Sequence, residues 1–435
     1  MVSCARRISR RRFLRDAGAA AAAPLVLPAS VFGQDGRAAP SERITTGHIG
    51  VGGQGLAHII GGPWVLKGGL VSLPDVQVLA AADVNVHAAN RAKNEAEKRY
   101  AAAAPSGSYK GFTAYTDFRE MLDRKDIDAV LVATHDPWHV PASMAAVKAG
   151  KDVYCEKPLS LTIREAREMV QAVRRYGRVF QTGTQQRSAE YNGWFRQACE
   201  LVRNGRIGKL QTVLVGVGHT SSDRWFPAQP VPEGFNWDMW LGPAPWREYN
   251  SEIVRGSWFG IRDFSGGEIT NWGAHHFDIV QWALDMDGSG PTEILPPDGK
   301  DIKTLTYKYA NGVVVLHDPS FNGIKFNGTD GRIFVNREQF KTEPEEIAKQ
   351  PLGPGDVRLL KNTGHHRNWL DCIKTRRRPN ADVEIGCRSV TVCHLGNIAY
   401  WLKRPLTWDP AKETFVGDPE ADRWLERPRR SPWTL

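Results

Sequence analysis

The spacing of apolar residues changes character at about residue 189 of this 435-residue chain. Over residues 41–188, short apolar runs such as 127–134 alternate with amphipathic stretches such as 162–177. The runs are typical of strands buried in a parallel sheet, and the stretches have the period of helices that cover one. The alternation predicts a doubly wound α/β domain that binds its ligand at the carboxyl ends of the strands.

Residues 189–435 follow a different pattern, a helical stretch and then longer strands of alternating polarity. Residues 302–318 predict a β-hairpin in which Asn311 and Gly312 form a two-residue turn. We therefore expect a second, α+β domain with a largely antiparallel open sheet.

Residues 1–40 have the composition of a signal and linker. Arginines follow Ser9 at positions 10–12, then come Phe13 and Leu14, and then an alanine-rich apolar stretch. This order is typical of a twin-arginine export signal, and a basic amphipathic helix is the alternative. The apolar stretch is short for a membrane span, and no later run is long enough. We expect an exported, periplasmic protein with no membrane span in the mature chain.

The bulk composition, 41% hydrophobic and 24% charged, is that of a globular protein. Much of the net charge of +9 lies in the N-terminal arginines, so the remainder is too weakly basic to suggest nucleic-acid binding. Apart from Cys4, the cysteines are odd in number and lack metal-ligand spacing. We expect no metal site and no obligatory disulfide.

Glycines after the first apolar run form a dinucleotide motif. Gly50, Gly52 and Gly55 have the G-x-G-x-x-G spacing, with Gly53 inside it, and the motif lies between a predicted strand and a predicted helix. This context indicates a Rossmann domain. The next strand closes on Asp83, whose carboxylate can bind both ribose hydroxyls of NAD. No arginine directly follows Asp83, so we expect NAD rather than NADP; a solvated aspartate is the alternative.

Polar side chains fall at the predicted carboxyl ends of the later strands, where a dinucleotide would lie. They are Thr134, His139, Glu156, Lys157 and Gln185. Glu156 and Lys157 are the least expected, because a charged pair followed by proline ends an apolar strand. We take the five as candidate cofactor contacts, with solvated strand ends as the alternative.

One predicted helix, starting near residue 272, has a polar stripe beside an apolar one. Asn271, His275, Asp278 and Trp282 follow each other at one-turn intervals. Such a stripe is either a solvated surface or the lining of a site, and spacing alone leaves both open.

These motifs resemble the glucose–fructose oxidoreductase, inositol dehydrogenase and MocA (Gfo/Idh/MocA) family, over nearly the whole mature chain. The resemblance rests on the glycine loop, on His139 and its flanking segment, and on Glu156-Lys157-Pro158. It implies that Lys157 lies beside the nicotinamide and takes part in hydride transfer, and that the open sheet makes oligomer contacts. Two later segments, 236–246 and 364–373, resemble exported members of the family, and Trp237 and Trp240 in the first are candidate walls of a sugar pocket.

The family motif D-x-G-x-H-x-x-D matches residues 271–278 except at its first position. The resemblance implies that His275 exchanges the substrate hydroxyl proton, and it maps the final aspartate to Asp278. The first aspartate is Asn271 here, and an amide cannot stabilise a charged imidazole as a carboxylate would. Whether His275 is the base, or shares this role with Lys157 or the neighbouring His276, stays open. The candidate catalytic residues are Lys157, His275, Asn271 and Asp278.

The sequence therefore predicts an exported NAD-dependent oxidoreductase with a tightly bound cofactor, acting on a secondary alcohol of a sugar, glycoside or polyol. One alternative is a lyase or glycosidase that uses transient oxidation. The other is a sugar-binding member of the family without activity, which the change at Asn271 makes conceivable.

Overall fold

A computed structural model describes residues 38–63, 65–104 and 107–434. The chain divides into two units, Met1–Arg43 and Ile44–Leu435. In the first unit, Pro40–Glu42 form the 3-10 helix η2, and the predicted export signal lies outside the described residues. Both β-sheets lie in the second unit.

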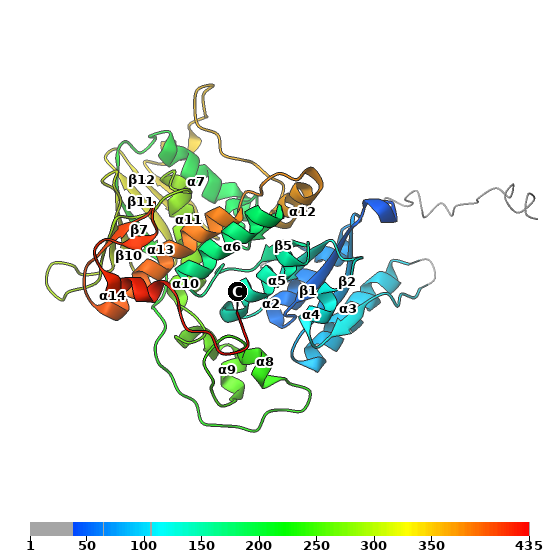
Figure 1. The fold of residues 1–435 in the computed structure, drawn as a ribbon. Helices are drawn as coiled ribbons and strands as arrows, with labels where there is room; N and C mark the ends of the chain where they lie inside the picture. Colours follow the sequence, from blue (N-terminus) through cyan, green and yellow to red (C-terminus); the bar gives the residue numbers. More distant parts are fainter. Residues whose placement is uncertain (1–37, 64, 105–106, 435) are drawn as a thin grey trace, which may run out of the picture. The chain divides into compact units, whose positions relative to one another are not determined.

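Six parallel strands form the first sheet, in the order β3-β2-β1-β4-β5-β6. Figure 1 labels β1, β2 and β5 of this sheet. The strands are β1 Ile44–Ile49, β2 Val76–Ala82, β3 Thr113–Tyr115, β4 Ala129–Val132, β5 Asp152–Cys155 and β6 Phe180–Thr182. The strand order reverses beside β1, so the carboxyl ends of β1 and β4 form the switch point where such sheets bind ligands. The predicted Rossmann sheet is confirmed.

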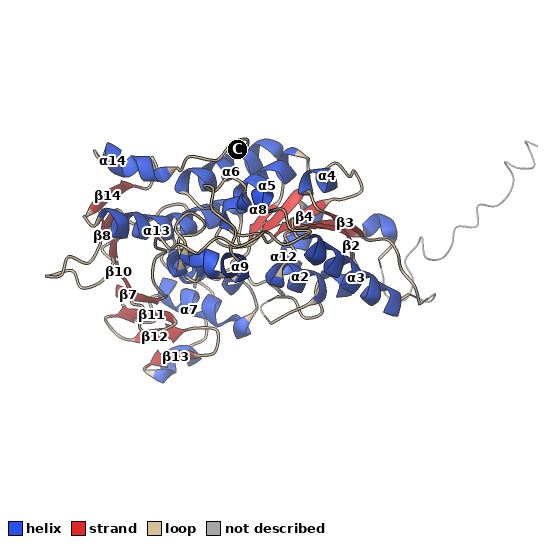
Figure 2. Cartoon of the chain, turned by 90° about the horizontal axis from the view of Figure 1, so that it is seen from below, coloured by secondary structure: helices blue, strands red, loops and turns tan. Residues whose placement is uncertain are grey.

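Helices cover both faces of this sheet: α4, α5 and α6 pack on one face, and α2, α3 and α12 on the other (Figure 2). Their bounds are α2 Gly53–Ile60, α3 Val86–Ala102, α4 Phe118–Leu122, α5 Asp136–Lys148, α6 Ile163–Tyr176 and α12 His365–Thr375. Local sequence fixes the ends of α6, because the Thr162 side chain accepts from the N–H of Glu165 and Gly177 adopts a left-handed conformation.

The second sheet has nine strands in the order β13-β12-β11-β7-β10-β9-β8-β14-β15. They are β7 Leu210–Gly216, β8 Glu293–Leu295, β9 Thr306–Lys308, β10 Val314–His317, β11 Gly323–Gly328, β12 Arg332–Val335, β13 Phe340–Glu343, β14 Leu406–Asp409 and β15 Thr414–Phe415. Only the β7–β10 pairing is parallel, so the expected, largely antiparallel sheet is confirmed. The predicted β9–β10 hairpin is present, but the Tyr309 N–H donates to the Val313 carbonyl, which makes the turn one residue longer than expected.

Three helices pack on one face of the second sheet: α7 Trp194–Arg203, α11 Gly273–Ala283 and α13 Val383–Leu402. Helix α13 also packs against α6 and so joins the two sheets. The remaining helices are α8 Trp237–Leu241, α9 Ser251–Arg255, α10 Glu268–Asn271 and α14 Pro419–Asp422, with 3-10 turns η3 Leu70–Ser72, η4 Gln185–Arg187, η5 Tyr191–Gly193, η6 Ser257–Gly260, η7 Glu345–Lys349 and η8 Arg423–Leu425. In the described part of the chain, no helix is long and apolar enough to cross a membrane.

Later segments return to the first sheet, so the predicted boundary after residue 188 stays a prediction. Trp369 of α12 lies in the first sheet's core. Residues 234–236, which we call the strap, bond to the junction of β2 and α3: the Gly234 carbonyl accepts from Val86 N–H, and Asn236 N–H donates to the Val84 carbonyl, both at 2.9 Å. The strap therefore lies beside the end of β2.

Candidate active site

The glycine loop follows β1 and leads into α2, as the motif predicts. Gly50 has a φ of 77°, which favours glycine, and a Cβ on Gly55 would lie 1.9 Å from the Gly50 carbonyl oxygen. At Gly52 and Gly53, by contrast, an added Cβ would meet nothing within 4 Å. The loop is closed on its inner side and open on its outer side, which suits the approach of a pyrophosphate.

Asp83 stands at the end of β2 and faces this loop. One carboxylate oxygen accepts from the N–H of Val51 at 2.8 Å and the other from the N–H of Asn85 at 2.9 Å. Burial raises the pKa of Asp83, and these two backbone bonds oppose the rise. The carboxylate is therefore fixed at the position where a Rossmann domain binds ribose.

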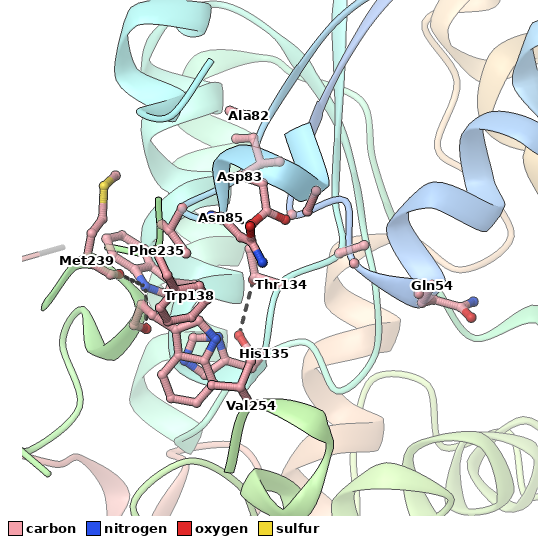
Figure 3. Close-up of a pocket in the computed structure, with 18 of the residues that line it drawn as sticks. Gln54, Ala82, Asp83, Asn85, Thr134, His135, Trp138, Phe235, Met239 and Val254 are labelled. Carbon is pink, nitrogen blue, oxygen red and sulfur yellow. Dashed lines mark hydrogen bonds between the residues drawn. The ribbon is translucent and has the colours of Figure 1, made fainter. Parts of the chain in front are cut away.

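A first cavity of about 450 Å³ lies between the glycine loop, Asp83 and an aromatic wall (Figure 3). In that wall, the rings of His135 and Trp240 stack 4.1 Å apart, and Trp237 stacks behind Trp240 at 4.7 Å. Trp240 thus lines the nucleotide side rather than a sugar pocket, and Trp237 only supports it. The open glycines and the fixed carboxylate fit NAD.

A second cavity of about 260 Å³ adjoins the first and shares Gln54, Ala133, Thr134 and Trp258 with its lining. It brings together most of the candidate residues. Those that line it are Thr134, His139, Glu156, Lys157, Gln185, Asn271 and His275. Strand ends of the first sheet and the α10–α11 segment of the second half therefore meet at one place.

Lys157 extends from the end of β5 to the α10 side of this cavity. Its Nζ donates to Asn271 Oδ1, and Asn271 Nδ2 lies 3.3 Å from each carboxylate oxygen of Glu268. Burial lowers the pKa of Lys157. A larger fraction of this lysine is consequently neutral than of an exposed one.

Glu156 points the other way, into a buried polar cluster. Its Oε1 accepts from His58 Nε2 at 2.9 Å and from Gln185 Nε2 at 3.0 Å, and its Oε2 accepts from the Lys157 N–H at 3.1 Å. His58 Nδ1 and His366 Nε2 lie 2.8 Å apart, so α12 is tied to this cluster. Glu156 thereby holds the strand end that presents Lys157.

His275 lines the second cavity, and the neighbouring His276 does not. The Nδ1 of His275 is buried without a hydrogen-bond partner among the described residues, while His276 Nδ1 donates to the Gly216 carbonyl at 3.0 Å. Burial lowers the pKa of His275 well below its ordinary value, and the charges of Arg337 and Lys157 lower it further. His275 is therefore a neutral imidazole at neutral pH.

Asp278 does not join the other three candidate catalytic residues. Its Oδ2 accepts from Arg187 Nε and its Oδ1 from Ser389 Oγ, both at 2.7 Å, and it is absent from the cavity lining. Arg187 also pairs with Asp287 at 2.6 Å. The polar stripe of the helix thus enters the protein interior after His275, and Asp278 positions Arg187, which lies away from the cofactor site.

His139 lines the second cavity, but its ring is committed to backbone. Nδ1 lies 2.5 Å from the Pro158 carbonyl oxygen and Nε2 3.0 Å from that of Thr134. The ring therefore joins the ends of β4 and β5 and sets the spacing of the strand ends that face the cofactor.

Three charged side chains near the second cavity were not predicted from the sequence. Asp136 and Arg337 line it, and Glu268 contacts it through Asn271. Burial raises the pKa of Asp136 to about 6, and its Oδ2 has no partner among the described residues. Asp136 stands at a strand end like the residues that were found, whereas Arg337 comes from the β12–β13 turn, which has no motif to mark it.

Comparisons with known proteins cover nearly the whole second unit. A model described as "Oxidoreductase family, NAD-binding Rossmann fold" (Gfo/Idh/MocA) matches residues 47–184, and its counterpart, "Oxidoreductase family, C-terminal alpha/beta domain", matches residues 212–435. A 1,5-anhydro-D-fructose reductase of Ensifer adhaerens is 40% identical over 68% of this chain and 83% of its own. An inositol 2-dehydrogenase of Klebsiella pneumoniae is 27% identical over 78% of this chain and 83% of its own.

Solved structures share the fold. The aldose-aldose oxidoreductase of Caulobacter crescentus, complexed with glycerol, has a TM-score of 0.57 at 17% identity, over 84% of this chain and 99% of its own. The WlbA dehydrogenase of Bordetella pertussis, in complex with NADH and UDP-GlcNAcA, has a TM-score of 0.59 at 16% identity, over the same shares of both chains.

Proposed function

This chain belongs to the Gfo/Idh/MocA oxidoreductase family, and we propose that it oxidises a secondary alcohol of a sugar, glycoside or polyol with NAD. The observation that carries the proposal is the second cavity, which adjoins the dinucleotide cavity and contains both Lys157 and His275. Proton-transferring side chains are thus concentrated beside the place where a bound cofactor would react.

The polar atoms of the second cavity favour a ligand with several hydroxyl groups. Asp136 Oδ2 and His275 Nδ1 are both buried without a partner among the described residues. The lining of this cavity also includes the polar side chains of Lys157, Asn271 and Gln185, and such a lining favours a ligand that donates and accepts hydrogen bonds over an apolar one. A polyol or sugar ring offers adjacent hydroxyls that serve as donor and acceptor.

Lys157 Nζ is the proton acceptor in this proposal. Bound NAD supplies the hydride acceptor in its nicotinamide ring. Asn271 Oδ1 holds one N–H of Lys157, which leaves the lone pair of the neutral amine for the substrate hydroxyl. His275 is a weaker base because its pKa lies well below the ordinary value. Its neutral ring orients the hydroxyl group instead.

A lyase or glycosidase reaction through transient oxidation is the second candidate, and Asp136 is the observation that favours it. A carboxyl group with a pKa of about 6 in the same cavity can take or give a proton at a neighbouring carbon near neutral pH. Incorporation of solvent deuterium at that carbon, with no net change in nicotinamide absorbance, would identify this reaction.

We also propose a retained cofactor and export by the twin-arginine route. The strap bonds to the β2–α3 junction beside Asp83 and lies over the nucleotide cavity, because Phe235 is part of the aromatic wall. This arrangement supports slow release of the dinucleotide. A protein exported already folded can carry such a cofactor with it, which agrees with the arginines that follow Ser9.

The open face of the second sheet is our proposed oligomer surface. Leu214 on β7 and Val314 and Leu316 on β10 are half-exposed there, opposite the buried residues that pack on the helices. Burial of such an apolar face against a second copy is favourable. Sedimentation of the purified protein would measure the oligomeric state.

The proposed function is tested on the full-length protein purified from the periplasm. Mass analysis of the released nucleotide should identify NAD or NADH. A substrate panel should include myo-inositol with NAD and 1,5-anhydro-D-fructose with NADH. The protein should turn over at least one of these substrates, and Lys157→Ala should abolish that turnover. A protein that neither contains nor binds a dinucleotide would contradict the proposal.

A further inference from the structure

Position 271 lies between two opposite charges. The Lys157 ammonium approaches one side of the Asn271 amide, and the Glu268 carboxylate lies 3.3 Å from the other. Because an ammonium only donates and a carboxylate only accepts, the amide oxygen must face the lysine and its nitrogen the glutamate. The asparagine therefore links a cation to an anion through two hydrogen bonds.

Glu268 is held in place from behind. Its backbone N–H donates to the His219 carbonyl at 2.9 Å, and a Cβ on Gly218 would lie 2.8 Å from the Glu268 Cγ. A side chain at position 218 would thus displace the carboxylate. Glu268 is not part of the cavity lining, so its hydrogen bonds reach the cavity through Asn271, while its charge also acts on Lys157 across space.

We propose that Glu268 is a positioning residue for the proton step: through the Asn271 amide it fixes Lys157 Nζ and stabilises the ammonium that forms when the lysine accepts a proton. This inference rests on the role given to Lys157 in the proposed function. Glu268 lies one helical turn before Asn271, and in this proposal it supplies the negative charge that position 271 lacks.

Several charged or titratable groups surround Lys157. They are Glu156 at the end of β5, Asp136 and His139 on α5, His275 on α11, Glu268 on α10 and Arg337 after β12. Burial lowers the pKa of Lys157 and Arg337 adds to this, while Glu156, Asp136 and Glu268 oppose it. Both oxygens of Glu156 already accept from other groups, so Glu268 is the carboxylate with a hydrogen-bonded path to Lys157 Nζ.

Lysine labelled with ¹³C at Cε reports the proton on Lys157 without any substrate. The resonance that is missing from the spectrum of Lys157→Arg belongs to Lys157. The chemical shift of this resonance in the unmutated protein is then measured as a function of pH, and its titration gives the midpoint. Glu268→Gln should lower the midpoint of Lys157 by roughly one pH unit, because one nearby negative charge is removed. Glu268→Asp should restore most of the midpoint. The matched control is Glu343→Gln on β13, since that carboxylate is 78% exposed and should have no effect.

A second comparison tests the path through the amide. Asn271→Asp alone would bring two carboxylates together, whereas in the double variant Glu268→Gln/Asn271→Asp the new amide can donate to the new carboxylate. The double variant should therefore have a higher melting temperature than Asn271→Asp. Additive effects of the two substitutions on the Lys157 midpoint and on melting would contradict the coupling.

The two proposals fail separately. An unchanged Lys157 midpoint in Glu268→Gln would overturn this inference even if the protein oxidises a polyol. If Glu268→Gln moves the Lys157 midpoint but the unmutated protein oxidises no alcohol, the coupling of Glu268 to Lys157 stands and the proposed function is refuted. With an active substrate, the acidic limb of the rate profile of Glu268→Gln should move to lower pH, because the neutral amine then persists at lower pH.

Discussion

Glutamine in place of Glu156 removes one buried negative charge and keeps the shape of the side chain. The Glu156 side chain is 6% exposed, and its oxygens accept from His58, Gln185 and the Lys157 backbone. A glutamine has an NH₂ group in place of one carboxylate oxygen, so a donor that now bonds to that oxygen would face another donor. Glu156→Gln should therefore destabilise the protein.

The size of the expected loss in unfolding free energy follows from the pKa of the Glu156 carboxyl group. Burial raises the pKa of Glu156, but the hydrogen bond and charge of His58, with the charge of Lys157, outweigh burial and hold it at about 2, against an ordinary 4.5. A carboxylate stabilised to this degree contributes at most roughly 3 kcal/mol to the free energy of unfolding. Because its pKa is lower in the folded state, the contribution is complete above the ordinary value of 4.5 and is lost as the pH falls towards 2.

Urea unfolding followed by tryptophan fluorescence measures this contribution, and Glu165 provides a matched control. Glu165 is also a buried glutamate, but burial raises its pKa, so its charged form is disfavoured in the folded protein at neutral pH. Glu165→Gln should lower the unfolding midpoint near pH 7 less than Glu156→Gln does, because the loss of its bonds with Leu161 N–H and Arg429 is offset by removal of a disfavoured charge. The loss in Glu156→Gln should be constant from about pH 7 to 5 and shrink below about pH 4.5. Equal midpoints for Glu156→Gln and the unmutated protein, or equal losses in both variants, would refute the reasoning.

Three further predictions concern the cofactor and the proton. Asp83→Ala should weaken NAD binding and relax discrimination against NADP, and equal affinity of the unmutated protein for both dinucleotides would contradict the assignment. Lys157→Ala should abolish hydride transfer while the melting temperature stays within about 5 °C, and retained turnover would remove the lysine from the proton step. Gly55→Ala should abolish dinucleotide binding, because its Cβ would lie 1.9 Å from the Gly50 carbonyl oxygen, whereas Gly53→Ala, which meets nothing within 4 Å, should keep the unmutated melting temperature.

Features coded by neighbouring residues could be predicted from the sequence. The glycine loop, Asp83 and the strand that ends at Glu156 each depend on a local pattern of apolar residues and turn-forming residues. Because the sheet is parallel, its geometry brings the carboxyl ends of these strands to one edge without further information. Their common placement therefore followed from the fold class alone.

Contacts between distant segments could not be predicted in this way. The His58–His366 contact joins residues 308 positions apart, and Arg337 reaches the second cavity from a turn of the other sheet. The strap likewise crosses to the end of β2 through backbone bonds, which leave no mark on side-chain periodicity. Such contacts depend on how α12, the strap and the second sheet pack on the first, and local propensity does not determine that packing.

Asn271 lies on the predicted face of the helix, but its hydrogen-bond partners are not the residue that was expected. Helical spacing placed Asn271 and His275 on one face, and both line the second cavity. The family resemblance paired them, because the first aspartate of the motif, the partner of its histidine, maps to Asn271, and the predicted helix started only near residue 272. Helix α10 begins at Glu268, however, so Asn271 also has a neighbour one turn back, and its amide bonds there and to Lys157. A carboxylate introduced by Asn271→Asp should still move the acidic limb of the rate profile upward in pH, but through a raised pKa of Lys157 rather than of His275. The variant His275→Asn separates the two explanations. If Lys157 is the titrating group, Asn271→Asp should still move the acidic limb upward in pH in a protein that lacks His275.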